Sequence, residues 1–233
     1  MKPSVSGMKA ILFDFGGTID TDGVHWSEKF WEYYEKYDLP VAKKDLERAF
    51  MSVEQQLAVK DCSNLTFLEV LHEQLSKQFV ILGIQENDEL LQSLKIACYQ
   101  DVVRTIDSAK IILEMLSKRY KLGVVSNFYG NLEIVCREFG LDEYMGAMID
   151  SVSVGVRKPD PRIFSLALRK LGVGSQETFV VGDSYDRDIV PAKHLGCTTV
   201  WLKGKSWTTP TDTSAADFAV QHFQEIRKIL LSS

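Results

Sequence analysis

Carboxylates, a hydroxyl and an ammonium group stand at well-separated points of this chain, each next to a short apolar or turn-forming stretch. Asp14 and Ser126 each follow an apolar run, Lys158 precedes a proline, and Asp183 and Asp188 follow a third apolar run. Mg²⁺ prefers one or two carboxylates together with substrate oxygens and waters. A lysine and a hydroxyl can neutralise and hydrogen-bond the remaining oxygens of an anion. If these side chains converge, they form a site for a divalent cation and an anion the size of phosphate.

Short apolar strands alternating with amphipathic helices supply the reason for convergence. We expect strands at 8–15, 121–126, 147–150, 178–181, 199–202 and 218–220. Helices are expected between them at 106–120, 132–139, 160–171, 186–195 and 223–231. This alternation predicts an α/β fold with a doubly wound parallel sheet. Ligands of such sheets collect at the carboxyl ends of the strands, where the chemical side chains fall.

The stretch from about residue 25 to 100 has a different pattern, without any strand signal. Aromatic and aliphatic residues recur there at spacings of three and four, which is typical of amphipathic helices. Four helices are expected, at about 26–37, 46–57, 68–79 and 88–99. We therefore predict a core domain formed by residues 1–20 and 104–233, with an inserted all-helical cap domain at 21–103. The length of 233 residues, about 1.6 times a typical domain, suits a core with one insertion.

Composition excludes several classes of function. The net charge is −5 and no lysine or arginine run exceeds two residues, which argues against nucleic-acid and anionic-membrane binding. The apolar runs are far too short to span a membrane, and the N-terminus lacks the apolar segment of a secretory signal. The cysteines are widely separated, so we expect reduced thiols and a cytoplasmic location; they are Cys62, Cys98, Cys136 and Cys197.

Four motifs, in this order, carry a resemblance to a known family. They are Asp14-Phe15-Gly16-Gly17-Thr18, Ser126-Asn127, Lys158-Pro159 and Gly182-Asp183-Ser184-Tyr185-Asp186-Arg187-Asp188. With them, and with a helical insertion after the first strand, the chain resembles the haloacid dehalogenase-like (HAD) hydrolases over about residues 8–220. The resemblance implies a Rossmann-type core with a helical cap.

The resemblance also implies a role for each matching residue. Asp14 would be the nucleophile and, with the Gly16 carbonyl and Asp183, would bind Mg²⁺. Lys158 would offset the negative charge shared by the nucleophile and the phosphate. Phosphate and substrate would be bound by Phe15, Ser126, Asn127 and Lys158, while Thr18 would support the loop and Asp188 would orient Lys158 or a metal-bound water.

Gly16 departs from the phosphatase version of the first motif. Phosphatases of the family carry a second aspartate two residues after the nucleophile, which protonates the leaving group, and such help is worth about 10²–10⁴ in rate. Asp20 and Asp22, just beyond the motif, are candidates to supply the proton. The leading interpretation is a Mg²⁺-dependent phosphatase of a small phosphorylated metabolite that acts through an aspartyl-phosphate.

Three alternatives stay open at this point. A haloacid dehalogenase lacks the second aspartate too, but it needs no Mg²⁺ and gives no reason for the acidic Gly182-Asp183 motif. A phosphonatase needs a Schiff-base lysine from the cap, for which Lys29 and Lys36 are candidates. A weakly active chain could instead use the HAD fold for binding or regulation.

Overall fold

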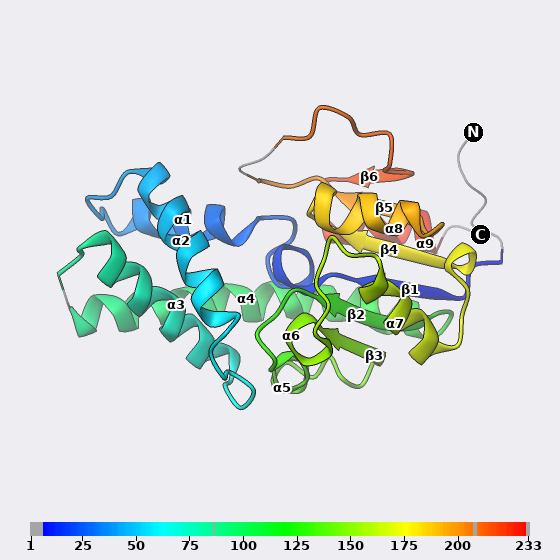
Figure 1. Cartoon of the computed structure of the whole chain (residues 1–233), viewed down its shortest axis with the longest axis horizontal. Coiled ribbons are helices and arrows are strands. Elements are labelled where there is room, and N and C mark those ends of the chain that lie inside the picture. The colour runs from blue at the N-terminus through cyan, green and yellow to red at the C-terminus, as the bar shows by residue number, and fades with distance from the viewer. Residues whose placement is uncertain (1–6, 86, 207–208, 232–233) are drawn as a thin grey trace.

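A six-stranded parallel sheet forms the centre of the larger lobe, on the right of Figure 1. The computed structural model describes residues 7–85, 87–206 and 209–231. The strand order is β3-β2-β1-β4-β5-β6, and every neighbouring pair is parallel. The strands are β1 (Ala10–Phe13), β2 (Lys121–Ser126), β3 (Met145–Asp150), β4 (Thr178–Gly182), β5 (Thr198–Leu202) and β6 (Phe218–Val220). The predicted α/β class is confirmed.

The sheet is covered on both faces, as the continuous apolar strands predict. Side chains of β1 alternate between two clusters: Ile11 and Phe13 belong to the one that includes α4, and Ala10 and Leu12 to the one that includes α7. The core helices after the insertion are α5 (Leu132–Glu138), α6 (Ser151–Val154), α7 (Arg162–Leu171), α8 (Val190–His194) and α9 (Ile226–Leu230). The helix expected at 186–195 is instead a wide turn at 185–189 followed by α8.

The segment between β1 and β2 forms the second lobe, on the left of Figure 1. Its helices are α1 (Trp26–Lys36), α2 (Lys43–Leu57), α3 (Phe67–Leu82) and the first part of α4 (Asp88–Ser117). Thr66 and Glu69 start α3 with reciprocal side-chain-to-backbone hydrogen bonds, a capping box. The described part of this segment is helical, as the spacing of its apolar residues predicts.

Helix α4 joins the two lobes without a break. Two helices with an interruption near residue 103 were expected, and this expectation is wrong: α4 runs for 30 residues, or about 45 Å. The intervening sequence contains neither glycine nor proline, and Cys98, Val102 and Ile106 continue one buried stripe. The proposed domain boundary at residue 104 therefore falls within a helix. Within the described residues, no helix is both long and apolar enough to cross a membrane.

A tight turn at Phe15–Ile19 begins directly after β1 and brings its backbone against the end of β4. Gly17 has a φ of +94°, in the left-handed region where residues with a Cβ are strained. A Cβ at Gly17 would also lie 2.5 Å from Oδ2 of Asp183, the first residue after β4. Glycine at this position therefore allows the carboxylate of Asp183 to approach the turn.

We expect Gly17→Ala to lower the free energy of unfolding by about 2–5 kcal/mol, the sum of left-handed strain and overpacking. Gly155→Ala is the matched control, because Gly155 has a φ of +67° but nothing within 4 Å of the added Cβ. It should cost only about 1–2 kcal/mol. Urea unfolding followed by circular dichroism measures both, and equal losses would contradict the steric role of Gly17.

Candidate active site

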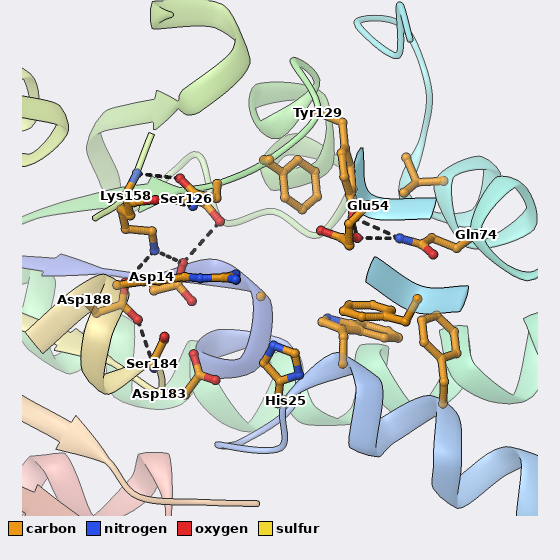
Figure 2. A pocket seen from close by; sticks show the side chains of 18 of the residues that line it. Asp14, His25, Glu54, Gln74, Ser126, Tyr129, Lys158, Asp183, Ser184 and Asp188 are labelled. Carbon is orange, nitrogen blue, oxygen red and sulfur yellow. Dashed lines mark hydrogen bonds and ion pairs between the residues drawn. The ribbon is translucent and has the colours of Figure 1, made fainter. Parts of the chain in front are cut away.

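Lys158 lies buried between two carboxylates at the carboxyl end of the sheet (Figure 2). Its Nζ is 2.5 Å from Oδ1 of Asp14, which follows β1, and 2.6 Å from Oδ1 of Asp188, which follows β4. Burial alone would lower the pKa of Lys158, but the charges of Asp14 and Asp188 outweigh it and raise the pKa. Lys158 is therefore a fixed positive charge against the carboxylate of Asp14.

Thr18 connects the first turn to Asp183. Its hydroxyl lies 3.2 Å from Oδ2 of Asp14 and 3.3 Å from Oδ1 of Asp183, and it accepts a hydrogen bond of 3.1 Å from the backbone N–H of Asp183. Thr18 is fully buried. This one hydroxyl therefore fixes the spacing between the two carboxylates, although its single proton serves only one of them at a time.

The three aspartates form a compact acidic cluster with room for a metal ion. Asp14, Asp183 and Asp188 each offer an oxygen, and these oxygens all lie within 4.8 Å of one another. Burial, followed by the charges of Asp14 and Asp188, raises the pKa of Asp183 well above its usual value. Burial also raises the pKa of Asp188 to about 6. Three buried carboxylates outnumber the one lysine, and their hard oxygens suit a divalent cation such as Mg²⁺.

Residues of the second and third motifs lie beside Asp14 and Lys158 at the same end of the sheet. The Ser126 hydroxyl, at the end of β2, donates to Oδ1 of Asp14 at 3.2 Å. The Asn127 amide holds the backbone of Lys158 through two hydrogen bonds, of 2.8 and 3.0 Å. The Phe15 side chain is fully buried and packs on Phe128, so a substrate contact by Phe15 is limited to its backbone. The structure thus brings the predicted residues together, while their roles stay predictions.

Gly16 faces an indole rather than open space. A Cβ there would lie 3.7 Å from Cδ1 of Trp26, whose Nε1 donates to Oδ2 of Asp20 at 2.7 Å. Asp20 is almost completely buried and also accepts from the backbone of Gly17 at 2.7 Å, and burial raises its pKa to about 7. Asp22 accepts from the backbone of Phe223 at the other side of the linker. Neither aspartate is among the described residues that line the cavity.

A cavity of about 100 Å³ lies between the acidic cluster and the cap. Its wall is largely aromatic; the rings belong to Trp26, Phe30, Phe50 and Phe67 of the helical segment and to Phe128 and Tyr129 of the loop after β2. His25 lines the cavity as well, and burial lowers its pKa to about 4, so the ring is neutral near pH 7. The small volume favours a small substrate.

Sequence reasoning missed four polar residues of this cavity: Glu54, Gln74, Tyr129 and Arg187. One of them left a signal. Glu54 stands four residues after Phe50 on α2, so it shares the face on which the apolar stripe of that helix lies. A charged residue on a buried helical face points to a function. Arg187 belongs to the fourth motif, which brings it near the site, but no role was expected for it. Gln74 and Tyr129 are ordinary surface residue types, and only the fold reveals their position.

Replacing Lys158 with methionine should destabilise the protein most at high pH. The variant keeps the apolar stem but leaves the buried carboxylates without their cation, which costs about 3 kcal/mol or more at pH 8. Burial already raises the folded-state pKa of Asp188, so the protonated form of Asp188 stabilises the fold at low pH. This stabilisation is lost as the pH rises through that pKa. The loss in Lys158→Met should therefore shrink towards pH 5.

Urea unfolding at several pH values between 5 and 8 measures this difference. The control is Lys170→Met, an exposed lysine in the last turn of α7, which should change stability by less than about 0.5 kcal/mol. A loss of stability in Lys158→Met that does not change with pH would contradict the electrostatic account.

Comparisons with known proteins agree with this geometry. A family model for haloacid dehalogenase-like hydrolases matches residues 8–196. A "glyceraldehyde 3-phosphate phosphatase" of Methanocaldococcus jannaschii is 32% identical over 141 residues, which cover 59% of this chain and 60% of that protein. The "pyrimidine 5'-nucleotidase YjjG" of Escherichia coli is 25% identical over 168 residues, or 71% of this chain and 73% of that protein.

Solved structures give the same fold. A "HAD phosphatase from Thermococcus onnurineus" has a TM-score of 0.56 at 25% identity and covers 96% of this chain and 98% of its own. A "dehalogenase" has a TM-score of 0.68 at 19% identity, with 99% and 100% covered, and that likeness concerns the fold alone. The chain spans about 60% of the length of the first archaeal relative. Since the family match covers most of its residues, the chain belongs to the haloacid dehalogenase-like hydrolases.

Proposed function

We propose that this protein hydrolyses phosphate monoesters of small molecules, with Asp14 as the nucleophile. The observation that carries the proposal is the buried ammonium of Lys158, which contacts Asp14 within a cluster of three aspartates. An anionic substrate needs that positive charge, and the excess carboxylates need a metal ion. The phosphatase names of the archaeal relatives support the same reaction class.

In this proposal, an oxygen of Asp14 forms a bond to phosphorus while the bond between phosphorus and the ester oxygen breaks, and the leaving oxygen takes a proton from a water. A water then attacks the aspartyl-phosphate and releases inorganic phosphate, which restores the carboxylate. Lys158 offsets the negative charge, and Ser126 and Asn127 bind phosphoryl oxygens. Because the cap covers the cavity, it limits the access of water to the intermediate. Positioning and charge stabilisation supply most of the catalysis in such transfers.

Asp14, the Gly16 carbonyl and Asp183 would hold Mg²⁺, with Asp188 orienting Lys158. Bound there, the ion would neutralise the carboxylates enough for a phosphate to approach. The raised pKa of Asp183 supports the assignment, because buried carboxylates of this kind gain from a cation. The buried, unpaired thiols support the proposed cytoplasmic location.

Gly16 keeps dehalogenation as a second candidate, since it provides no acid for an alcohol leaving group. The phosphonatase alternative has less support. Of its candidate lysines, Lys29 is ion-paired with Asp101, and neither Lys29 nor Lys36 is among the described residues lining the cavity.

Hydrolysis of small phosphate esters should require both Mg²⁺ and Asp14. We expect phosphate release to stop with EDTA, to return with added Mg²⁺, and to fall by about 10³-fold or more in Asp14→Asn. A panel of phosphate esters assayed for free phosphate tests this. Halide release from 2-haloacids that EDTA leaves unchanged would instead identify a dehalogenase.

Gly16→Asp should raise turnover of esters with poor leaving groups. The backbone at Gly16, with φ −73° and ψ 116°, accepts a side chain, and the Cβ would make only an ordinary contact with Trp26. An added general acid should speed the hydrolysis of alkyl phosphates by about 10²-fold and leave the hydrolysis of aryl phosphates almost unchanged. Gly16→Asn is the matched control without an acid. The absence of a gain with any ester would count against the phosphatase.

A further inference from the structure

A polar cluster made of Glu54, Gln74 and Tyr129 interrupts the aromatic wall of the cavity, across from Asp14 (Figure 2). Glu54 comes from α2, Gln74 from α3, and Tyr129 from the loop after β2. Gln74 Nε2, at 2.5 Å, and the Tyr129 hydroxyl both donate to the same oxygen, Oε1 of Glu54. Its other oxygen, Oε2, has no hydrogen-bond partner among the residues that the structure describes.

The cap orients this cluster from behind through a chain of buried hydrogen bonds. The Tyr34 hydroxyl donates to Oε1 of Gln78 at 3.0 Å, and Gln78 Nε2 donates to Oε1 of Gln74 at 3.1 Å. Each amide therefore presents its NH₂ group in the direction of Glu54. Since every neighbour in the chain donates towards it, Glu54 is held as a hydrogen-bond acceptor.

The protonation of Tyr129 fits the same conclusion. Burial, with the nearby charge of Glu54, raises the pKa of Tyr129 well above its usual value, so its hydroxyl remains a donor. Burial raises the pKa of Glu54, while the hydrogen bond from Tyr129 and the charges of Arg187 and Arg157 act to lower it. Both arginines are exposed, and although Arg187 lines the same cavity, no ion pair joins either of them to Glu54 among the described residues. A cationic ligand would satisfy the remaining oxygen.

We propose that Oε2 of Glu54 binds an ammonium group of the substrate, so that the preferred substrate is the phosphate monoester of a short amino alcohol. This inference rests on the proposed phosphatase function, which places the phosphate at Asp14 and Lys158. Aromatic rings, including those of Trp26 and Phe50, line the same cavity, and aromatic rings attract cations. A substrate carboxylate at the same place would be repelled by Glu54 and left without hydrogen bonds.

Three esters of nearly equal size separate these chemistries: 2-aminoethyl phosphate, 2-hydroxyethyl phosphate and phosphoglycolate. The wild-type protein should give the highest kcat/KM with the aminoethyl ester and the lowest with phosphoglycolate. Glu54→Gln should reduce kcat/KM for the aminoethyl ester about 10- to 100-fold, because a charge-assisted hydrogen bond is lost. The same variant should change kcat/KM for the hydroxyethyl ester less than about threefold and raise kcat/KM for phosphoglycolate.

Two further variants separate recognition from folding. Glu47→Gln changes a second glutamate of α2, which is not among the described residues that line the cavity. It should leave kcat/KM for all three esters as in the wild type. Tyr129→Phe removes one donor but keeps the charge of Glu54, so it should keep the preference for the aminoethyl ester. Circular dichroism confirms that each variant folds.

The outcomes also separate this inference from the proposed function. If hydrolysis depends on Asp14 but Glu54→Gln affects all three esters equally, the ammonium site is wrong and the phosphatase stands. If no ester is hydrolysed, the proposed phosphatase function is wrong. Calorimetric binding of the esters to Asp14→Asn then tests the ammonium site at Glu54. Binding of 2-aminoethyl phosphate at least tenfold tighter than phosphoglycolate, lost when Glu54→Gln is added, supports the site; equal binding overturns it.

Discussion

The contact on which the active site depends is the buried ion pair of Lys158 with Asp14 and Asp188. Burying charge is costly unless it is paired, so this lysine both holds the carboxylates in place and is held by them. Asn127 fixes the backbone of the lysine, while Thr18 joins Asp14 to Asp183. The arrangement still carries an excess of negative charge. In the proposed function, a bound Mg²⁺ would offset that excess and so allow a phosphate to approach Asp14.

The fold makes the cluster possible by bringing backbones unusually close. At Gly182 a Cβ would lie 2.5 Å from the Cβ of Asp188, so glycine there lets the turn after β4 fold back onto the strand. The helical segment opposite supplies an aromatic wall and one oriented carboxylate, Glu54. In the proposed function, the core provides the reacting groups, and the helical segment provides the contacts that distinguish one substrate from another.

The strands and the chemical motifs could be predicted because both depend on local signals. Apolar runs end at Asp14, Ser126 and Asp183, and parallel strands bring such ends to one edge. The continuity of α4 was missed because hydrophobic periodicity was divided between two expected helices. Glu54 and Tyr129 were missed for a different reason: they are 75 residues apart, and their pairing depends on how α2 packs over the loop after β2.

Whether Asp14 takes up the phosphoryl group is the most direct test of this account. The protein can be mixed with a radiolabelled phosphate ester and Mg²⁺, quenched in acid within the first turnover, and digested into peptides. The account predicts label on the peptide that contains Asp14, removed by hydroxylamine as expected of an acyl phosphate, and no label in Asp14→Asn. Phosphate release without a labelled peptide, or label on another residue, would contradict it.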